Sequence, residues 1–274
     1  MYEKFWGLNR RPFDNAIQPE FFFSGDAHQA ARLKLRYAIE NRLGAGLLIG
    51  GVGSGKTFLA AVLLAEMADR FRPVIHLVFP QMNPSEFLSY LAFELGAEEA
   101  RSAGEAGVDR SLRHIESALR QHAEQGRRPT LLIDDAHLID DPRVFVTLQL
   151  LLNLQQQSRY DFSLILVGER SLAGRLSRVA QLDERIGVRA VLEPLSHAQT
   201  AAYVQHRLEV AGAARRIFDD GALRVISELS GGMPRRINRL CDLALVVGYA
   251  DDLKIITATE IAAVSDELPT SAAA

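Results

Sequence analysis

The segment that most constrains this chain is Gly50-Gly51-Val52-Gly53-Ser54-Gly55-Lys56-Thr57, which matches the pattern G-x-x-x-x-G-K-[ST]. An apolar run at 47–49 precedes this phosphate loop, and an apolar, helix-forming run at 58–61 follows it. A strand before and a helix after distinguish a phosphate-binding loop from a chance glycine-rich turn. The segment therefore predicts a site for a nucleoside triphosphate, with ATP as the expected ligand.

The chemistry of a polyphosphate explains each residue type in the loop. Glycines permit the positive φ angles and the close approach that let backbone N–H groups surround the anion, and the following helix presents its N-terminus to it. Lys56 is expected to place its charge on the β- and γ-phosphates, and the Thr57 hydroxyl is expected to ligate Mg²⁺. The residues expected to hold the nucleotide here are Gly51, Val52, Gly53, Ser54, Gly55, Lys56, Thr57 and Phe58.

A second acidic motif follows an apolar run, Leu131-Leu132-Ile133-Asp134-Asp135. An acid at the carboxyl end of a strand points toward the crevice in which α/β sheets bind ligands. Asp134 is expected to orient the Mg²⁺ shell together with Thr57, and Asp135 to polarise the attacking water. The alternatives for Asp135 are helix capping or mere proximity to the site. His137 either lines the site, contacts Asp135, or is a hydrogen-bonded polar residue without a role in it.

Strand and helix patterns alternate along most of the chain, which predicts an α/β fold with a parallel sheet covered on both faces. The five expected strands are 45–49, 73–79, 130–133, 162–167 and 188–192. The expected helices between them are 26–43, 57–70, 84–95, 109–125 and 142–157. The first of these has apolar residues at Ala30, Leu33, Tyr37 and Ile39 or at positions near them.

After Pro194 the pattern becomes wholly helical, with expected helices at 196–211, 219–229, 234–249 and 257–267, and with Ser196 and Thr257 as N-caps. The aromatic segment 1–24 is interrupted by Pro12 and Pro19, so we expect an extended surface strap and no helix there. The expected organisation is a strap beside the nucleotide site at 1–25, an ATPase α/β domain at 26–194 and a small all-helical lid domain at 195–270.

Composition sets limits on the remaining function classes. Of the 274 residues, 48% are hydrophobic and 24% charged, and the net charge is −3, which describes an ordinary globular protein. This acidic balance argues against binding nucleic acid through overall charge, but it leaves room for a local basic patch. The single cysteine, Cys241, lies in an apolar helical pattern and is expected to be buried. With no internal disulfide, signal peptide or membrane span in the sequence, we expect a cytoplasmic protein.

Taken together, these residues resemble the AAA+ ATPase domain of the general secretion pathway protein A (ExeA-like) group, which is related to transposition ATPases of the TnsC and TniB type. The resemblance covers nearly the whole chain. Its motifs are the opening Met1-Tyr2 with Phe5-Trp6-Gly7-Leu8 and Pro12-Phe13, the phosphate loop, Asp134-Asp135-Ala136-His137, Leu166-Val167-Gly168-Glu169, Arg185-Ile186, and Gly231-Gly232-Met233-Pro234-Arg235-Arg236-Ile237-Asn238. It implies a P-loop NTPase fold of the AAA+ type, with three layers around a five-stranded parallel sheet and a helical lid.

The resemblance also implies roles for further residues. Pro12 and Phe13 correspond to the segment beside the adenine, and Arg235 to the sensor-2 arginine that reaches the γ-phosphate, with Arg236 as its alternative. Arg185 corresponds to the arginine finger donated to the next subunit, with Arg178 as the alternative. A guanidinium suits this task because it stays charged and binds two oxygens at once. The expected catalytic set is Lys56, Asp135, Arg185 and Arg235.

Three departures from the family pattern qualify these expectations. Asp135 stands where the family usually has Glu, so hydrolysis is expected to be slow or dependent on a partner. Glu169 stands at the sensor-1 position, where a carboxylate would repel the γ-phosphate unless a partner such as Arg170 paired with it. Secretion members often continue into a membrane span and a cell-wall-binding domain. The sequence ends at Ala274 with neither, so a separate partner is expected to supply that link.

The preferred function is an ATPase that binds and hydrolyses ATP-Mg to assemble or remodel a cell-envelope secretion or pilus-like complex. Its expected partners are further copies of itself and an unidentified protein that could recruit it to the inner membrane, with 97–108 and 140–144 as candidate partner-facing loops.

Three further functions compete with this one. The first is a DNA-associated ATPase of the transposition type, whose candidate basic clusters are Arg127-Arg128, Arg215-Arg216 and Arg235-Arg236 with Arg239. The second is an ATP-gated scaffold with little hydrolysis, which the acids at Asp135 and Glu169 would explain. The third is a small-molecule kinase, and the helical lid argues against it.

Overall fold

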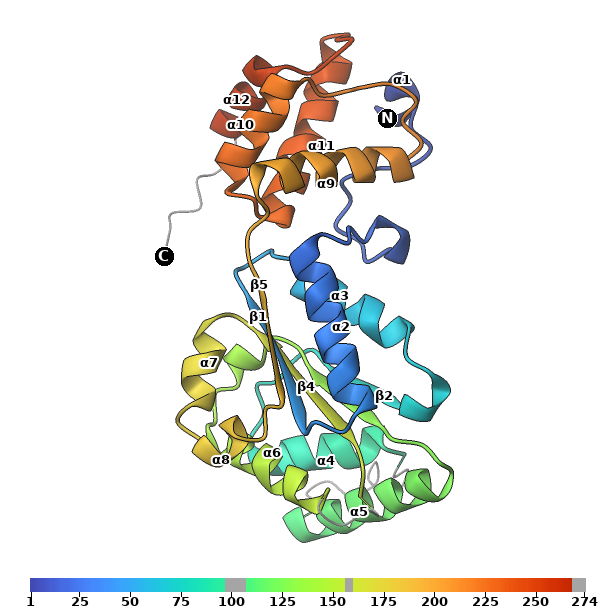
Figure 1. The fold of residues 1–274 in the computed structure, drawn as a ribbon, viewed down its shortest axis with the longest axis vertical. Helices are drawn as coiled ribbons and strands as arrows, with labels where there is room; N and C mark the ends of the chain where they lie inside the picture. Colours follow the sequence, from blue (N-terminus) through green and yellow to red (C-terminus); the bar gives the residue numbers. More distant parts are fainter. Residues whose placement is uncertain (97–106, 156–159, 268–274) are drawn as a thin grey trace. The chain divides into compact units, whose positions relative to one another are not determined.

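The computed structural model describes residues 1–96, 107–155 and 160–267, and it divides into two compact units. The sheet unit consists of Gln29–Gly50 and Leu59–Leu192, and the helical unit consists of Met1–His28, Gly51–Phe58 and the described residues from Glu193 on. The phosphate loop is therefore grouped with the N-terminal segment and the C-terminal helices, and the two units are described separately below (Figure 1).

The sheet unit is built on five parallel strands in the order β2-β3-β4-β1-β5. Their bounds are Ala45–Gly50 (β1), Val74–Leu77 (β2), Thr130–Ile133 (β3), Ser163–Gly168 (β4) and Val188–Leu192 (β5). Every residue of β3 and β4 is buried. Near-continuous apolar strands of this kind are what a parallel sheet covered on both faces requires. The expected number and direction of strands are thus confirmed.

Helices cover both faces of this sheet (Figure 1). They are α2 (Asp26–Glu40), α3 (Lys56–Ala65), α4 (Pro84–Glu94), α5 (Val108–Glu124), α6 (Arg143–Leu154), α7 (Ser171–Leu176) and α8 (Ala180–Asp183), with 3-10 turns η2 (Asp69–Phe71) and η4 (Ala136–Leu138). Helix α2 packs closely on β1, because a Cβ built on Gly46 would lie 3.0 Å from Leu35 Cδ2. The chain needs glycine at position 46 to bring this helix so near the strand.

Several element boundaries differ from the expected ones for local reasons. Helix α2 ends at Glu40 and not at 43, because Arg42 and Gly44 turn the chain with φ values of 57° and 76°. Helix α3 ends at Ala65 and not at 70, the second strand is confined to Val74–Leu77, and α6 ends at Leu154. Helices α7 and α8 were not expected, because six and four residues are too few to show a helical repeat.

The apolar face expected for α2 is right at Ile39, which is buried, and wrong at Leu33 and Tyr37. Leu33 and Tyr37 are 54% and 58% exposed, whereas Ala31, Leu35 and Ala38 are buried beside Ile39. Both rows of residues have helical spacing, so the periodicity alone could not decide which one faces the sheet.

The helical unit contains α9 (His197–Val210), α10 (Asp220–Ser230), α11 (Pro234–Ala250) and α12 (Ala258–Glu267). Ser196 caps α9 as expected and forms a reciprocal capping box with Gln199. The Thr257 hydroxyl accepts a hydrogen bond from the Thr259 N–H at the start of α12. Cys241 is fully buried in α11, which confirms the expected buried cysteine.

The N-terminal segment is part of the core of the helical unit and is not an extended surface strap. It forms the short helix α1 (Glu3–Trp6) and the 3-10 turn η1 (Pro19–Phe21). Trp6 is 1% exposed, and its Nε1 donates to the Leu245 carbonyl at 2.9 Å. A Cβ on Gly248 would lie 2.7 Å from the Trp6 ring, so glycine makes room for it. Burial of aromatic surface stabilises this segment in the core in spite of Pro12 and Pro19.

Arg207 of α9 fastens this segment to the helices. Its side chain is 2% exposed and donates to the carbonyls of Pro12 at 2.5 Å and Asp14 at 2.7 Å. The guanidinium also lies 4.6 Å from the centre of the Phe21 ring. Among the described helices, none is long and apolar enough to cross a membrane.

We predict that Arg207→Met lowers the free energy of unfolding of the helical unit by about 3 kcal/mol, because the buried Pro12 carbonyl and the partly buried Asp14 carbonyl lose a charged donor. Urea unfolding followed by fluorescence of Trp6, the single tryptophan of the chain, measures this unit. The exposed Arg224 provides the control, since Arg224→Met should change the value by less than about 0.5 kcal/mol. Equal effects of the two substitutions would show that Arg207 does not hold the segment.

Candidate nucleotide site

The phosphate loop has the shape that its glycines predict. Gly53 and Gly55 have φ values of 76° and 92°, which side chains with a Cβ rarely adopt. The Ser54 N–H donates to the Gly51 carbonyl at 3.2 Å, and helix α3 begins at Lys56. Lys56 is only 7% exposed, and its Nζ donates to the Gly51 carbonyl at 2.9 Å. The lysine is therefore held against the loop, while the Thr57 side chain is exposed.

His28 contacts the phosphate loop through its side chain, and sequence reasoning did not predict this contact. Its Nε2 lies 3.0 Å from the Ser54 carbonyl and must donate to it, since a carbonyl only accepts. A Cβ on Gly55 would lie 3.4 Å from the same nitrogen. Burial lowers the pKa of His28 and outweighs the opposing effect of the hydrogen bond to Ser54. The imidazole is thus neutral near pH 7, and its buried Nδ1 has no hydrogen-bond partner among the described residues.

Arg235 stands at the second residue of α11, beside the loop. Its N–H donates to the Gly53 carbonyl at 3.2 Å, and a Cβ on Gly53 would lie 2.7 Å from the Cβ of Arg235. Gly53 is therefore glycine for two reasons, its positive φ and the close approach of α11. The side chains of Arg235 and Arg236 are both exposed at this helix start.

Two pockets of very different size adjoin these residues within the helical unit. One, of about 30 Å³, is lined by Phe22, Phe58 and His28, with the Phe22 and Phe58 rings 5.7 Å apart in an edge-on arrangement. The other, of about 420 Å³, is lined by Phe13, Arg235, Arg239 and Asp242.

The smaller of these pockets is lined by Phe22, to which sequence reasoning assigned no role in the site. Pro12 and Phe13, expected beside the adenine, are buried; Phe13 packs on Phe218 at 6.2 Å and shares the larger pocket with Arg235. Phe22 lies beside the loop residue Phe58 instead. The available clue was the aromatic run Phe21-Phe22-Phe23, which precedes α2 in the sequence.

The acidic motif belongs to the sheet unit, where it follows β3. Asp134 is 2% exposed, its Oδ1 accepts from the Asp135 N–H at 2.9 Å, and its Oδ2 lies 3.7 Å from His76 Nε2. Asp135 has a φ of 46° and directly precedes η4. Among the described residues, the Asp135 side chain makes no capping hydrogen bond to this turn. The capping alternative for Asp135 is therefore wrong.

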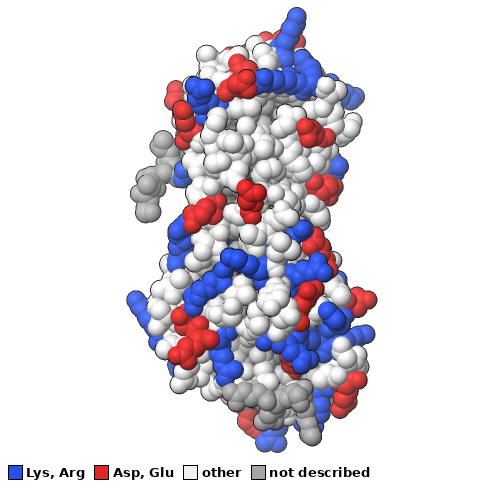
Figure 2. All heavy atoms as spheres, in the orientation of Figure 1, with Lys and Arg blue, Asp and Glu red and all other residues white. Residues whose placement is uncertain are grey.

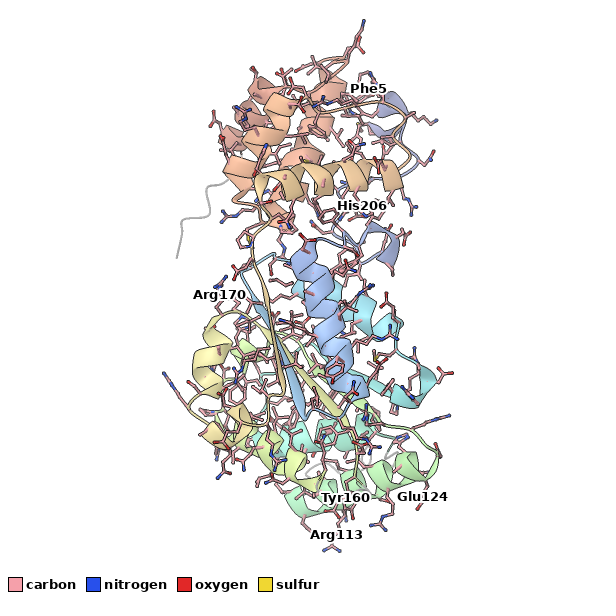
Figure 3. All side chains as sticks on the ribbon, viewed as in Figure 1. Phe5, Arg113, Glu124, Tyr160, Arg170 and His206 are labelled. Atoms are coloured by element: carbon pink, nitrogen blue, oxygen red, sulfur yellow. The ribbon has the colours of Figure 1, made fainter. Side chains whose placement is uncertain are left out.

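His137 lies between two carboxylates. Its Nε2 is 3.3 Å from Glu169 Oε1, and its Nδ1 is 3.9 Å from Asp135 Oδ1. Glu169 follows the carboxyl end of β4 and precedes Arg170 (Figure 3), and the structure pairs it with His137. A Cβ on Gly168 would lie 3.3 Å from His137 Nδ1, so glycine admits the imidazole. Of the interpretations of His137, contact with Asp135 is thus supported, and contact with Glu169 is added to it.

Parallel pairing puts these acids at one edge of the sheet. β4 pairs with both β3 and β1, with Ile133 opposite Leu166 and Ile49 opposite Gly168. β1 ends at Gly50, from which the chain passes directly into the phosphate loop. The carboxyl edge therefore carries Asp134, Asp135 and Glu169, together with the strand end that leads to the loop.

Arg185 is held by its own chain. Its Nη2 donates to Asn153 Oδ1 at 3.0 Å, and its carbonyl accepts from the Ala45 N–H at 3.0 Å. The side chain is half-buried, whereas that of Arg178 is exposed. A role of Arg185 toward a neighbouring copy would require its guanidinium to leave Asn153.

The residues of the phosphate loop fit a nucleotide that binds as its complex with Mg²⁺. The loop offers backbone N–H groups, a buried lysine and a hydroxyl, which suit a polyphosphate with Mg²⁺. Within residues 1–96, 107–155 and 160–267, no group of three or more His, Cys, Asp and Glu could hold a metal ion.

We predict that His28 makes the helical unit less stable in acid. Its folded pKa lies below the ordinary 6.5, so the unfolded chain takes up the proton first as the pH falls. Stability is therefore full above about pH 6.5 and declines below it. In His28→Gln the decline in stability should be shallower. Part of the decline should remain, because burial also lowers the pKa of His206.

The measurement is urea unfolding at a series of pH values, followed by Trp6 fluorescence. His197→Gln, a change at an exposed histidine of α9, is the control and should retain the full slope. An unchanged slope in His28→Gln would contradict the prediction.

Comparison with known proteins agrees with this geometry. Residues 40–176, half of the chain, match the family model described as "AAA domain". The chain is 33% identical over 257 residues to General secretion pathway protein A of Aeromonas hydrophila, an alignment that covers 91% of this chain and 45% of that protein. The chain thus spans less than half the length of this relative.

Solved structures share the fold at low sequence identity. The Aeropyrum pernix ORC2 protein has a TM-score of 0.69 and 17% identity, covering 94% of this chain and 72% of that chain. Cdc6p from Pyrobaculum aerophilum has a TM-score of 0.72 and 17% identity, covering 93% of this chain and 72% of that chain. The family match, the five-stranded parallel sheet and the phosphate loop lead to one conclusion: this chain belongs to the AAA+ family of P-loop proteins.

Proposed function

We propose that this chain binds ATP-Mg at the phosphate loop and hydrolyses it. The observation that carries the proposal is the prepared loop itself. Gly53 and Gly55 already have positive φ, Lys56 is held at the start of α3, and the start of α11 contacts Gly53. A loop shaped before the ligand arrives loses less conformational entropy on binding.

Each phosphate contact in the proposal has a named residue. Lys56 would bind the β- and γ-phosphates, and Thr57 and Asp134 would hold Mg²⁺. Arg235, whose backbone is anchored to Gly53, would direct its guanidinium to the γ-phosphate.

For the adenine, Pro12 and Phe13 remain predicted neighbours, and the structure adds a second candidate pocket at Phe22 and Phe58. That pocket, at about 30 Å³, is far smaller than a typical ligand pocket, so one of its rings would have to turn to admit a base.

Hydrolysis would use Asp135 to orient the attacking water. The contact between His137 and Glu169 offers a reason why a carboxylate is tolerated at the sensor-1 position, because the imidazole Nε2, 3.3 Å from Glu169 Oε1, can fix the position of that carboxylate. The same imidazole is 3.9 Å from Asp135. We infer that His137 positions both carboxylates, and that turnover is slow until a neighbour or partner completes the site.

The process that ATP hydrolysis would drive is proposed from the similarity to a curated relative. Similarity to General secretion pathway protein A suggests assembly or remodelling of a cell-envelope secretion complex, with recruitment to the inner membrane by a protein partner. Of the two loops proposed to face a partner, 97–106 lies outside the described residues. In 140–144 the Asp141 carboxylate is paired with Arg143 at 2.6 Å.

The DNA-associated alternative draws less support from the basic clusters. Arg128 is 7% exposed, and Arg216 pairs with Asp220, so neither is freely displayed. Figure 2 shows acidic and basic side chains interspersed on the visible face. Arg127, Arg215 and the arginines at the start of α11 are exposed, and those of α11 are the ones proposed for ATP.

The test is release of phosphate from ATP-Mg, measured over a wide range of protein concentration, with and without double-stranded DNA. We expect specific activity to rise with protein concentration and to be unaffected by DNA. Lys56→Ala should abolish it, because the lysine is the main charge in the loop. Tight ATP binding without turnover would favour the scaffold alternative, and stimulation by DNA would favour the transposition-type alternative.

A second prediction concerns Arg185 as the arginine finger. Arg185→Ala should lower the rate at high protein concentration by a factor on the order of 10³ without changing ATP binding by isolated subunits. Arg178→Ala is the matched control and should have little effect. If Arg178→Ala caused the loss and Arg185→Ala did not, the roles would be exchanged.

A further inference from the structure

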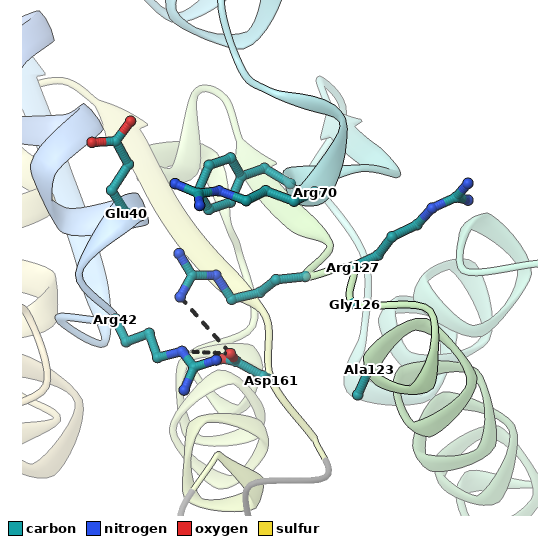
Figure 4. A pocket seen from close by; sticks show the side chains of 9 residues that line it. Glu40, Arg42, Arg70, Ala123, Gly126, Arg127 and Asp161 are labelled. Carbon is teal, nitrogen blue, oxygen red and sulfur yellow. Dashed lines mark ion pairs between the residues drawn. The ribbon is translucent and has the colours of Figure 1, made fainter.

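The sheet unit contains a pocket that the proposed function does not use. It has a volume of about 400 Å³, and its polar lining consists of Arg42, Arg70, Arg127, Arg128, Glu40 and Asp161 (Figure 4). Arg42 lies between α2 and β1, Arg70 lies in η2, and Arg128 and Asp161 lie just before β3 and β4. Segments from four parts of the chain thus bring their charges to one place.

The pocket lies at the amino edge of the sheet. Arg42, Arg128 and Asp161 precede the first residues of β1, β3 and β4, which are Ala45, Thr130 and Ser163. The acidic motif follows the opposite ends of these parallel strands. Strands of this length separate the two edges by roughly 13–20 Å. The pocket is therefore distinct from the carboxyl edge.

Arg128 is the buried centre of the pocket. It is 7% exposed, and its guanidinium lies 4.9 Å from the centre of the Phe71 ring. Its Nε and Nη2 are buried without a hydrogen-bond partner among the described residues, and its Nη1 is 3.8 Å from Asp161 Oδ2, which is too long for a hydrogen bond. Burial lowers the pKa of Arg128, and the nearby Arg42 and Arg70 lower it further against the effect of Asp161. A buried cation with unmet donors is costly unless an anion accepts from it.

The carboxylates of the pocket do not balance its arginines. Asp161 is shared, because Arg42 Nε lies 2.9 Å from the same Oδ2 that faces Arg128. Glu40 is engaged by Arg36 at 2.9 Å. Among the residues the structure describes, Arg70 and Arg127 make no ion pair, and Arg127 points away from Asp161 in Figure 4. Apart from Arg127, the three guanidinium groups of the pocket have one carboxylate, that of Asp161, to balance them, because Arg36 engages Glu40, and two positive charges are left uncompensated.

We propose that this pocket binds a phosphoryl dianion, either as inorganic phosphate or as the phosphate end of a small molecule. Two negative charges match the excess, and guanidinium groups bind phosphate oxygens in pairs. The volume lies within the range of small-ligand sites. A concave pocket centred on a buried arginine suits a compact anion better than it suits a nucleic-acid strand.

The test is isothermal titration of inorganic phosphate into the full chain carrying Lys56→Ala, at constant ionic strength. That substitution weakens phosphate binding at the phosphate loop, so a failure of the ATPase proposal does not affect the result. We expect one saturable site. Arg42→Gln should weaken it about ten-fold through loss of one charged contact. Arg42 has a largely exposed side chain, so this variant should fold.

Two further variants sharpen the test. Arg113→Gln changes an exposed arginine of α5 outside the pocket and should leave phosphate affinity unchanged (Figure 3). Asp161→Asn should act in the opposite direction and tighten phosphate binding, because Arg42 and Arg128 lose their competing carboxylate. Circular dichroism verifies that each variant is folded.

The titrations distinguish inorganic phosphate from the phosphate end of a small molecule, and some of their outcomes would overturn the proposal. Phosphoserine binding more tightly than inorganic phosphate would support the phosphate end of a small molecule, and equal affinity would support the free ion. Absence of saturable binding would overturn the proposal. So would equal losses in Arg42→Gln and Arg113→Gln, weaker binding in Asp161→Asn, or Arg42-dependent binding of double-stranded DNA without binding of phosphate.

Discussion

The parallel direction of all five strands is the constraint on which this structure depends. It sends every strand end to one edge of the sheet and every strand start to the opposite edge. Asp135 and Glu169 lie far apart in the sequence, yet they follow adjacent strands and both lie near His137. The same rule gathers Arg42, Arg128 and Asp161 at the opposite edge. The two edges thus acquire opposite chemistry, acidic at the strand ends and basic at the strand starts.

The elements predicted from sequence were those with strong local patterns. The phosphate loop, the five strands and the four C-terminal helices were found because each has a motif or a long apolar repeat. Helices α7 and α8 are too short for such a repeat. On α2 the sequence offered two apolar rows, and only packing against Gly46 selected the row containing Leu35.

Contacts between distant segments were beyond sequence reasoning for a different reason. Arg207 binds the Pro12 carbonyl across 195 positions, and no local pattern announces a bond to a backbone oxygen. The aromatic N-terminal segment, interrupted by Pro12 and Pro19, was therefore predicted to be a surface strap, although its aromatic rings make it part of a core. His28 was missed similarly, since its role is a contact with the Ser54 carbonyl. Composition can show that aromatic rings need burial, but only the fold shows what they are buried against.

Paired arginines illustrate why charge in a sequence is a poor guide to charge on a surface. Arg127 and Arg128 are neighbours, but one is exposed and the other is almost wholly buried against Phe71. The chain has a net charge of −3, yet it concentrates an excess of positive charge in one concave site. Because a buried guanidinium loses its hydration and cannot readily release its proton, it must find an anion. An unbalanced pocket in an acidic protein is therefore a more specific indication of a ligand than a basic patch on a basic one.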